Sequence, residues 1–163
     1  MSATVCSTRV WASQARISTV PKFGTVEVRV CDSQTRVEHT LALAALVQAM
    51  VKELAEHFEE GKRLSRYPYE MLDENKWLAA RHGLEGELVD LPERRMVPAK
   101  ELGRRLYDRL REHAQDLGGA DELEGILDLL EKGTGAARQR VVYEANHDWT
   151  ELLAEIVKAT TAD

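Results

Sequence analysis

Residues 24–32 read Gly-Thr-Val-Glu-Val-Arg-Val-Cys-Asp, which is the clearest β-strand pattern in the sequence. Successive side chains of a strand point to opposite faces, so one face carries Val26, Val28 and Val30. The other face carries Glu27 and Arg29, a carboxylate and a planar cation held side by side on a rigid element. Sites for a metal and an anionic substrate are commonly built in this way. The pattern leaves open an exposed ion pair on a solvated sheet face.

A long helix is predicted directly after this strand. Residues 36–60 contain neither Gly nor Pro, and Gly61 is positioned to end the helix. Asp32 and Ser33 are the expected caps at its start. Because residues 41–47 are apolar nearly all round, this half of the helix is predicted to be buried on several sides. A strand that is followed by a buried helix indicates that the helix packs across a sheet.

The rest of the chain is predicted to be mainly helical. Pro68 opens one helix that Gly83 closes, and Pro98 opens another that runs to Leu117. Between these two helices, residues 89–92 form a short extended piece and a turn. Asp121 and Glu124 form a capping-box-like start for a helix over 123–132. Asp148 with Glu151 opens the last helix. Residues 1–20 show no steady period and are predicted to be irregular or weak strand.

Composition and charge exclude several classes of protein. The 163 residues are 44% apolar, which is enough for a packed core, and the net charge of -6 with scattered basic residues argues against a nucleic-acid-binding face. No secretory signal pattern opens the sequence, and the longest apolar run, 41–51, is too short to span a bilayer. Two cysteines, Cys6 and the mid-strand Cys31, form no disulfide framework, which predicts a reduced, cytoplasmic setting.

Three familiar catalytic patterns are also missing. Gly133-Thr134-Gly135 is followed by no Lys-Ser/Thr pair and preceded by no strand, so a helix-to-helix turn explains it better than a phosphate-binding loop. The five histidines show no metal-ligand spacing, and no Gly-x-Ser-x-Gly elbow is present. Arg138 and Arg140, which follow the glycines, fit either a solvated face or an anion contact.

A second segment with chemical interest lies in the helix that Gly83 closes. Residues 75–86 read Asn-Lys-Trp-Leu-Ala-Ala-Arg-His-Gly-Leu-Glu-Gly. The helical period places Arg81 on the same side as Trp77 and Leu78, an apolar face. An arginine in that position is more often a snorkelling or paired structural residue than a ligand contact.

Together, residues 21–32 (Pro-Lys-Phe-Gly-Thr-Val-Glu-Val-Arg-Val-Cys-Asp) and residues 75–86 resemble the carboxylate-amine ligases of the glutamate-cysteine ligase type 2 family. The two motifs occur in the family's order and are joined by a buried helix. The tail over 133–140, Gly-Thr-Gly-Ala-Ala-Arg-Gln-Arg, also looks like the family's. The resemblance extends from Pro21 to the C-terminus.

The resemblance implies a glutamine-synthetase-like fold in which an antiparallel sheet forms the active-site floor and helices cover its back. The expected fold class is therefore α+β, a predominantly helical fragment with a short antiparallel sheet. Residues 1–20 form an irregular or degenerate segment, and residues 21–163 form the C-terminal half of a ligase catalytic domain.

The family's chemistry uses ATP to phosphorylate a γ-carboxylate, after which an amine displaces the phosphate. The resemblance implies ATP and Mg2+ as cofactors, glutamate and cysteine or a similar amine as substrates, and a place in glutathione biosynthesis. Glu27 would be a magnesium ligand, and Arg29 the catalytic residue that holds the glutamate carboxylate or the transferring phosphoryl group. Asn75 and Arg81 are assigned to substrate binding through their place in the family motif. Neither nucleic acid nor membrane is an expected partner.

The sequence departs from the family in two places. The family's N-terminal half, which supplies further acidic metal ligands and a His-x-His strand, is absent, so an incomplete site is expected. Before Pro21 the family has Trp-Asp-Ile-Arg-Pro-Ser-Pro, whereas this chain has Ala-Arg-Ile-Ser-Thr-Val-Pro over 15–21. The codons TCG-ACC-GTC-CCC, which would encode Ser18 to Pro21, read Arg-Pro-Ser-Pro when shifted by one base. We therefore hypothesise that the first twenty residues are a frameshifted remnant of a longer gene.

Two functions follow from these observations. The chain is either a part of an ATP-dependent glutamate-cysteine or related ligase, or a non-catalytic remnant or helical module that binds a partner. Self-association or binding of a complementary N-terminal half is expected in either case, because a strand without its sheet neighbours exposes backbone edges and apolar surface.

Overall fold

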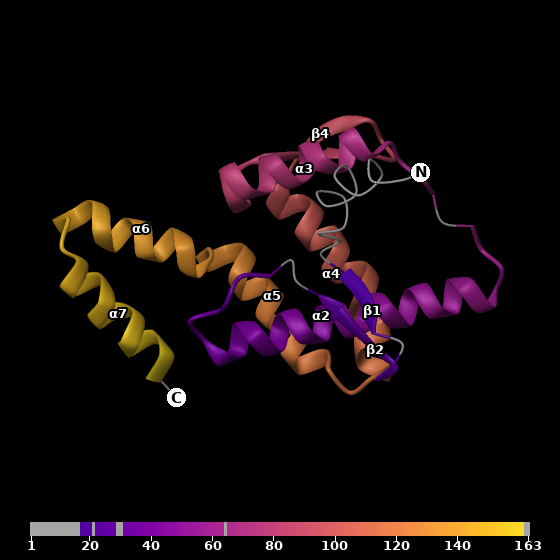
Figure 1. The fold of residues 1–163 in the computed structure, drawn as a ribbon, viewed down its shortest axis with the longest axis horizontal. Coiled ribbons are helices and arrows are strands. Elements are labelled where there is room, and N and C mark those ends of the chain that lie inside the picture. The colour runs from indigo at the N-terminus through magenta and orange to yellow at the C-terminus, as the bar shows by residue number, and fades with distance from the viewer. Residues whose placement is uncertain (1–16, 21, 29–30, 64, 162–163) are drawn as a thin grey trace, which may run out of the picture. The chain divides into compact units, whose positions relative to one another are not determined.

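The computed structural model describes residues 17–20, 22–28, 31–63 and 65–161 (Figure 1). The chain divides into two compact units, residues 1–33 and residues 34–163. Each unit is described by itself. The fold is α+β and predominantly helical, with short antiparallel strand pairs, as the sequence predicts.

The described part of the first unit is a β-hairpin. Strand β1 (Ile17–Val20) pairs antiparallel with strand β2 (Thr25–Val28), and Ser18 lies opposite Glu27. Gly24 has a φ of +62°, a backbone conformation that glycine adopts without steric cost, and this lets the chain reverse just before Thr25. The predicted start of the strand at Thr25 is confirmed. The prediction that Cys31 lies in the strand is wrong, because Cys31 is an exposed residue in a bend after it.

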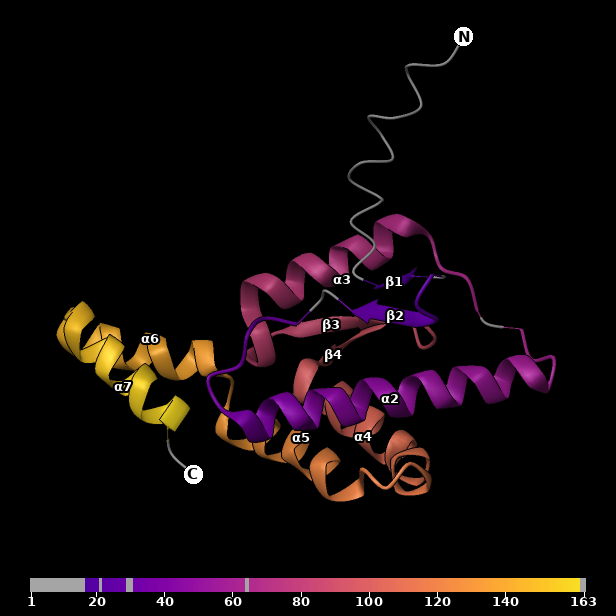
Figure 2. The ribbon, with the colours of Figure 1, turned by 60° about the horizontal axis from the view of Figure 1, so that its bottom comes forward.

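Three helices form the core of the second unit: α2 (Val37–Glu59), α4 (Ala99–Asp116) and α5 (Ala120–Lys132). Figure 2 shows α2 packed across α4 and α5. Their apolar faces meet in one cluster of buried side chains, made of Ala42, Ala45, Ala49, Tyr107, Leu110, Ala114, Leu123, Ile126, Leu129 and Leu130. The long helix predicted over 36–60 is therefore present, with Gly61 in the left-handed region at its end.

The buried face of α2 is narrower than the sequence predicts. Alanines 42, 45 and 49 are buried, whereas Leu41 is 48% exposed. The reason is the close approach of α5: a Cβ placed on Gly125 would lie only 2.8 Å from the Cβ of Ala42. Such a crossing admits only small side chains, so the larger residues of 41–47 are directed to its flanks or to solvent.

A second layer consists of helix α3 (Tyr69–His82), the short 3-10 helix η1 (Gly83–Glu85) and a hairpin. The hairpin joins strands β3 (Glu87–Asp90) and β4 (Arg95–Pro98), with Asp90 opposite Arg95. Strand β4 was not predicted, because its four residues are too few to show alternation. Pro98 ends β4 and caps α4, which confirms the helix start predicted there.

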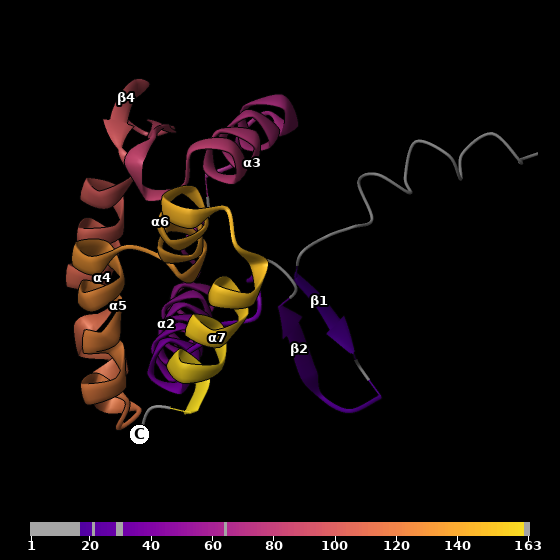
Figure 3. The ribbon, with the colours of Figure 1, turned by 90° about the vertical axis from the view of Figure 1, so that its left-hand side faces the viewer.

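The last two helices, α6 (Gly135–Asn146) and α7 (Trp149–Thr161), pack on each other as an α-hairpin (Figure 3). Asp148 Oδ1 accepts a hydrogen bond from the Thr150 N–H at 2.7 Å, so the predicted start of α7 is confirmed. The two other predicted caps are wrong, since Arg36 precedes α2 and Gly119 precedes α5, and neither helix start has a side-chain cap. Among the described residues, no helix combines the length and the apolarity needed to cross a membrane.

The close crossing of α2 and α5 gives a first prediction. We expect Gly125→Ala to lower the free energy of unfolding by about 1 kcal/mol, because overpacking costs about 1–3 kcal/mol and the gain in helix propensity is about 1 kcal/mol. The control is Gly103→Ala in α4. Its new Cβ would meet the Leu130 Cδ2 atom at 2.7 Å, the end of a flexible side chain that is able to shift.

Urea unfolding of the two variants and the wild type measures the difference. Gly103→Ala should stay within about 0.5 kcal/mol of the wild type or exceed it. A Gly125→Ala variant that is more stable than the wild type would contradict the close crossing.

Candidate functional site

The residues predicted to form a site fall in both units of the chain. Glu27 is a half-buried residue of β2 in the first unit, and Arg29 lies outside the described residues. Asn75 and Arg81 are residues of α3 in the second unit. The structure therefore describes Glu27 separately from the α3 pair, and the joint site stays a prediction.

Asn75 fastens α3 to the β3–β4 hairpin. Its Nδ2 donates to the Val89 carbonyl oxygen at 2.8 Å, and its Oδ1 accepts from the Val89 N–H at 2.7 Å. The side-chain amide thus pairs with both polar groups of one residue, as a neighbouring strand would. This contact explains why an asparagine suits position 75 on structural grounds. Substrate binding by Asn75 stays a prediction.

Arg81 stacks on an exposed aromatic ring. Its guanidinium carbon lies 5.5 Å from the centroid of Trp77, which is 55% exposed, and His82 packs edge-on against the same ring at 6.1 Å. Arg81 and Trp77 therefore lie on the same side of α3, as predicted, although both side chains face solvent. Arg81 is itself exposed, and an exposed guanidinium is suited to a carboxylate or phosphate. Its role toward a substrate stays a prediction.

The two glycines at the end of residues 75–86 form the corner between α3 and β3. Gly83 has a φ of +58° and ends α3. A Cβ on Gly86 would lie 2.5 Å from the Cβ of His82, and the Gly86 carbonyl accepts from the Ala99 N–H at 2.9 Å. Both positions thus require glycine for steric reasons. Together with the Asn75 contact, these two glycines specify the corner between α3 and β3.

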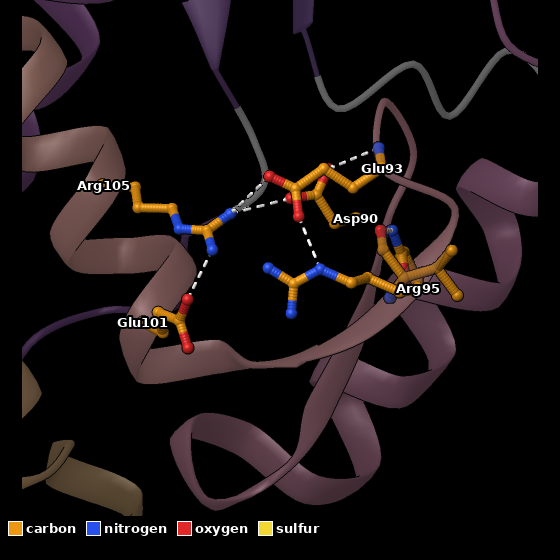
Figure 4. A network of polar contacts seen from close by, with 7 residues as sticks. Asp90, Glu93, Arg95, Glu101 and Arg105 are labelled. Carbon is orange, nitrogen blue, oxygen red and sulfur yellow. Dashed lines mark hydrogen bonds and ion pairs between the residues drawn. The ribbon is translucent and has the colours of Figure 1, made fainter.

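A charged cluster joins the same hairpin to α4 (Figure 4). Arg105 of α4 donates through Nη1 to Asp90 at 3.0 Å and to Glu93 at 3.3 Å, and through Nη2 to Glu101. Glu93 also accepts from Arg95. Partial burial tends to lower the pKa of Arg105, but the Glu101 hydrogen bond and the three negative charges outweigh it and raise that pKa. The cluster therefore joins the hairpin to α4 through a stable set of ion pairs.

This cluster was not recognised from the sequence, although signals for it were present. Glu101 and Arg105 have the i,i+4 spacing of a helical ion pair, and Asp90 ends an apolar strand just before a turn. Because each of its three carboxylates is paired with Arg95 or Arg105, the cluster is a structural element rather than a binding site for a cation.

Magnesium does not fit the described residues as they stand. Across 17–20, 22–28, 31–63 and 65–161, no three His, Cys, Asp or Glu side chains gather in a way that could hold a metal ion. Mg2+ requires several hard oxygen ligands in near-octahedral geometry. Glu27 by itself does not provide such a site.

A buried histidine forms another polar pair with catalytic residue types. His39 of α2 is 2% exposed, and its Nε2 lies 3.5 Å from Asp128 Oδ2 on α5. A hydrogen bond from Lys132 lowers the pKa of Asp128. Burial tends to raise this pKa, and the hydrogen bond from His39 lowers it further. The Nδ1 atom of His39 is buried without a partner. An imidazole closed off from solvent in this way has no route to a substrate, so the pair serves to hold α2 and α5 together.

The Asn75 contact predicts a loss of stability. Asn75→Ala should lower the free energy of unfolding by about 1–3 kcal/mol, since two hydrogen bonds are removed and the Val89 peptide groups lose their partners. Asn146→Ala is the matched control, because the Asn146 amide contacts only the exposed Glu151 side chain. Chemical denaturation of both variants measures the difference. Equal stabilities would mean that Asn75 does not hold the hairpin.

The lowered pKa of Asp128 predicts a specific loss of stability in acid. A carboxyl whose folded pKa lies below its ordinary value of 3.8 stabilises the fold above about pH 4, and this contribution is lost as the pH falls through the folded pKa. Asp128→Asn should therefore be destabilised near neutral pH and lose less stability than the wild type between about pH 4 and pH 2. Exposed Asp108→Asn is the control, and parallel pH profiles for Asp128→Asn and the wild type would contradict the assignment.

Comparison with known proteins places the chain in a family. A model of "Glutamate-cysteine ligase family 2(GCS2)" matches residues 8–159. A Rubrobacter xylanophilus protein named "Putative glutamate--cysteine ligase 2-1" is 44% identical over 140 residues, which cover 86% of this chain and 37% of the relative. Proteins named "Putative glutamate--cysteine ligase 2" from Sorangium cellulosum and Chloroflexus aggregans are each 37% identical over 86% of this chain, with 38% and 36% of their own lengths covered.

The chain thus spans less than two-fifths of the length of these relatives. The family match, in contrast, includes nearly every residue from the β1–β2 hairpin to α7. The chain belongs to glutamate-cysteine ligase family 2.

Proposed function

We propose that this chain supplies part of the active site of an ATP-dependent carboxylate-amine ligase that joins glutamate to cysteine or a similar amine. The observation that carries the proposal is the family match over residues 8–159. The relatives' names support the same ligase activity. A place in glutathione biosynthesis and a cytoplasmic setting belong to this proposal.

Arg29 and Arg81 are the proposed anion-binding residues of the chain. Arg29 would hold the glutamate carboxylate or the transferring phosphoryl group, since a planar guanidinium binds either one through two parallel hydrogen bonds. The exposed position of Arg81 on Trp77 supports a second contact with a substrate carboxylate. Asn75, six residues earlier in α3, is the other substrate-binding residue proposed in this helix.

The proposed site is incomplete in this chain. Glu27 would be one ligand of the magnesium ion that accompanies ATP, and the described residues offer no group that completes its coordination. The relatives are more than twice as long as the matched region. We therefore propose that the remaining ligands belong to the part of the relatives that this chain does not match, and that the chain by itself does not turn over ATP.

The test compares the chain alone with a reconstituted enzyme. Phosphate release from ATP is measured with glutamate, cysteine and Mg2+, first for the purified chain and then for the chain co-expressed with the unmatched part of the Rubrobacter xylanophilus relative. No turnover is expected from the chain alone, and glutamate-dependent turnover is expected from the pair. Turnover by the chain alone would contradict the proposed incompleteness.

Variants of the reconstituted enzyme test the assigned residues. Arg29→Lys should lower kcat/KM, with a loss of about 2–4 kcal/mol in transition-state stabilisation. The reason is that the point charge of a lysine does not replace the planar guanidinium of an arginine. Glu27→Gln should weaken the dependence on Mg2+. Exposed Arg111→Lys is the control and should leave turnover unchanged. Unchanged activity in Arg29→Lys would remove Arg29 from the site.

A second candidate function is that of a helical module that binds a partner. One face of α7 carries Trp149, Leu153 and Val157 at four-residue spacing, all exposed. Such an apolar stripe on a surface helix indicates a covered face. Self-association of the chain when its complementary part is absent would support this reading. Light scattering on the same preparations distinguishes a monomer from a larger particle, and a monomer would contradict it.

A further inference from the structure

Helix α2 has a second apolar side, separate from the alanines that pack on α5. Its residues recur at alternating intervals of four and three, and all of them are exposed. We call this side the α2 seam, and it consists of Val37, Leu41, Ala44, Gln48, Val51, Ala55 and Phe58. The alternation is the a and d pattern of a coiled coil, in which such a seam packs against a second helix.

The α2 seam extends over nearly the whole helix. Helix α2 has 23 residues and is therefore about 34 Å long. Val37 at the start of the seam is 65% exposed, and Phe58 at its end is 85% exposed. Leu54, also exposed, widens the seam in its C-terminal half. A long apolar stripe on the surface of a helix indicates a face that another element covers.

The side-chain sizes along the seam fit an antiparallel helix of the same sequence. In one register of two antiparallel α2 helices, every layer joins a larger side chain to a smaller one. The layers are Leu41 with Val51, Val37 with Ala55 and Gln48 with Ala44, each repeated by the two-fold symmetry. A parallel pair would instead place Ala44 against Ala44 and Ala55 against Ala55, and these layers would leave voids.

The charges beside the seam favour the same register. It brings Glu38 next to Lys52 of the second copy, and symmetry gives two such pairs. Within its own chain the Lys52 ammonium contacts Glu56 and, at 3.2 Å, Asp116. An ammonium group has three N–H donors, so the third is available to Glu38. An antiparallel pair shifted by one heptad would place Glu38 beside Glu59, which are like charges.

From these features we propose that two copies of the chain associate through the α2 seam as an antiparallel helix pair. The layer of Gln48 with Ala44 lies next to the two-fold axis, where a polar residue helps to fix the register. The seam contains neither the exposed stripe of α7 nor any residue assigned to the ligase reaction. The proposal therefore depends on neither assignment.

Sedimentation velocity of the full chain should show a dimer at high micromolar concentration that dissociates on dilution. Val51→Glu places a charge in the seam of each copy and should weaken the association at least about tenfold. Leu153→Glu is the matched control, because Leu153 is an exposed apolar residue of α7, and it should leave the dimer unchanged. Circular dichroism confirms the helices of both variants. A wild type that stays monomeric, as expected if another segment covers the seam, would overturn the proposal, and so would a Val51→Glu dimer of wild-type affinity.

Cysteine cross-linking tests the direction of the pair without a charged variant. Leu41→Cys and Val51→Cys are made separately in a chain that carries Cys6→Ser and Cys31→Ser. Under oxidation, a mixture of the two should form an interchain disulfide, because positions 41 and 51 face each other in the proposed register. Neither variant by itself should do so. A disulfide formed equally well by Leu41→Cys alone, or no disulfide in the mixture, would overturn the antiparallel pair.

Discussion

The close contact of α2 with α5 is the constraint on which the second unit depends. At Gly125 the helices approach so closely that a methyl group would overlap Ala42, and the Ala45 and Ala49 positions continue the same narrow seam. Tyr107 and Leu110 of α4 and Leu123 and Leu130 of α5 then fill the space beside it. Ion pairs from Lys52 to Asp116 at 3.2 Å and from Arg109 to Glu53 at 3.1 Å join α2 to α4 at the edge of this core.

Polar contacts hold the second layer together and join it to this core. Asn75 pairs with the Val89 backbone, and Arg105 draws Asp90 and Glu93 of the hairpin onto α4. The segment over 75–86 therefore has a clear structural purpose, which is to turn α3 into β3. Within it, Arg81, whose guanidinium lies over the Trp77 ring, is the side chain that we propose for an anionic substrate. A family motif can thus combine fold-specifying residues with one residue suited to chemistry.

The family relation and the geometry both support the proposal of a partial site. Glu27 offers one carboxylate on a short hairpin, whereas magnesium requires several oxygen ligands. The relatives contain more than twice the matched length, which is where we propose that the missing ligands lie.

The sequence by itself determined the strand start at Thr25, the long helix after it, the helix ends at Gly61, Gly83 and Gly133, and the family. These features depend on local backbone preferences and on motif order, which neighbouring residues encode. Only the tertiary structure decided which face of α2 is buried, that Arg95–Pro98 pairs with Glu87–Asp90, and that Arg105 gathers three carboxylates. Each of these depends on groups far apart in the chain, whose distances no local pattern specifies.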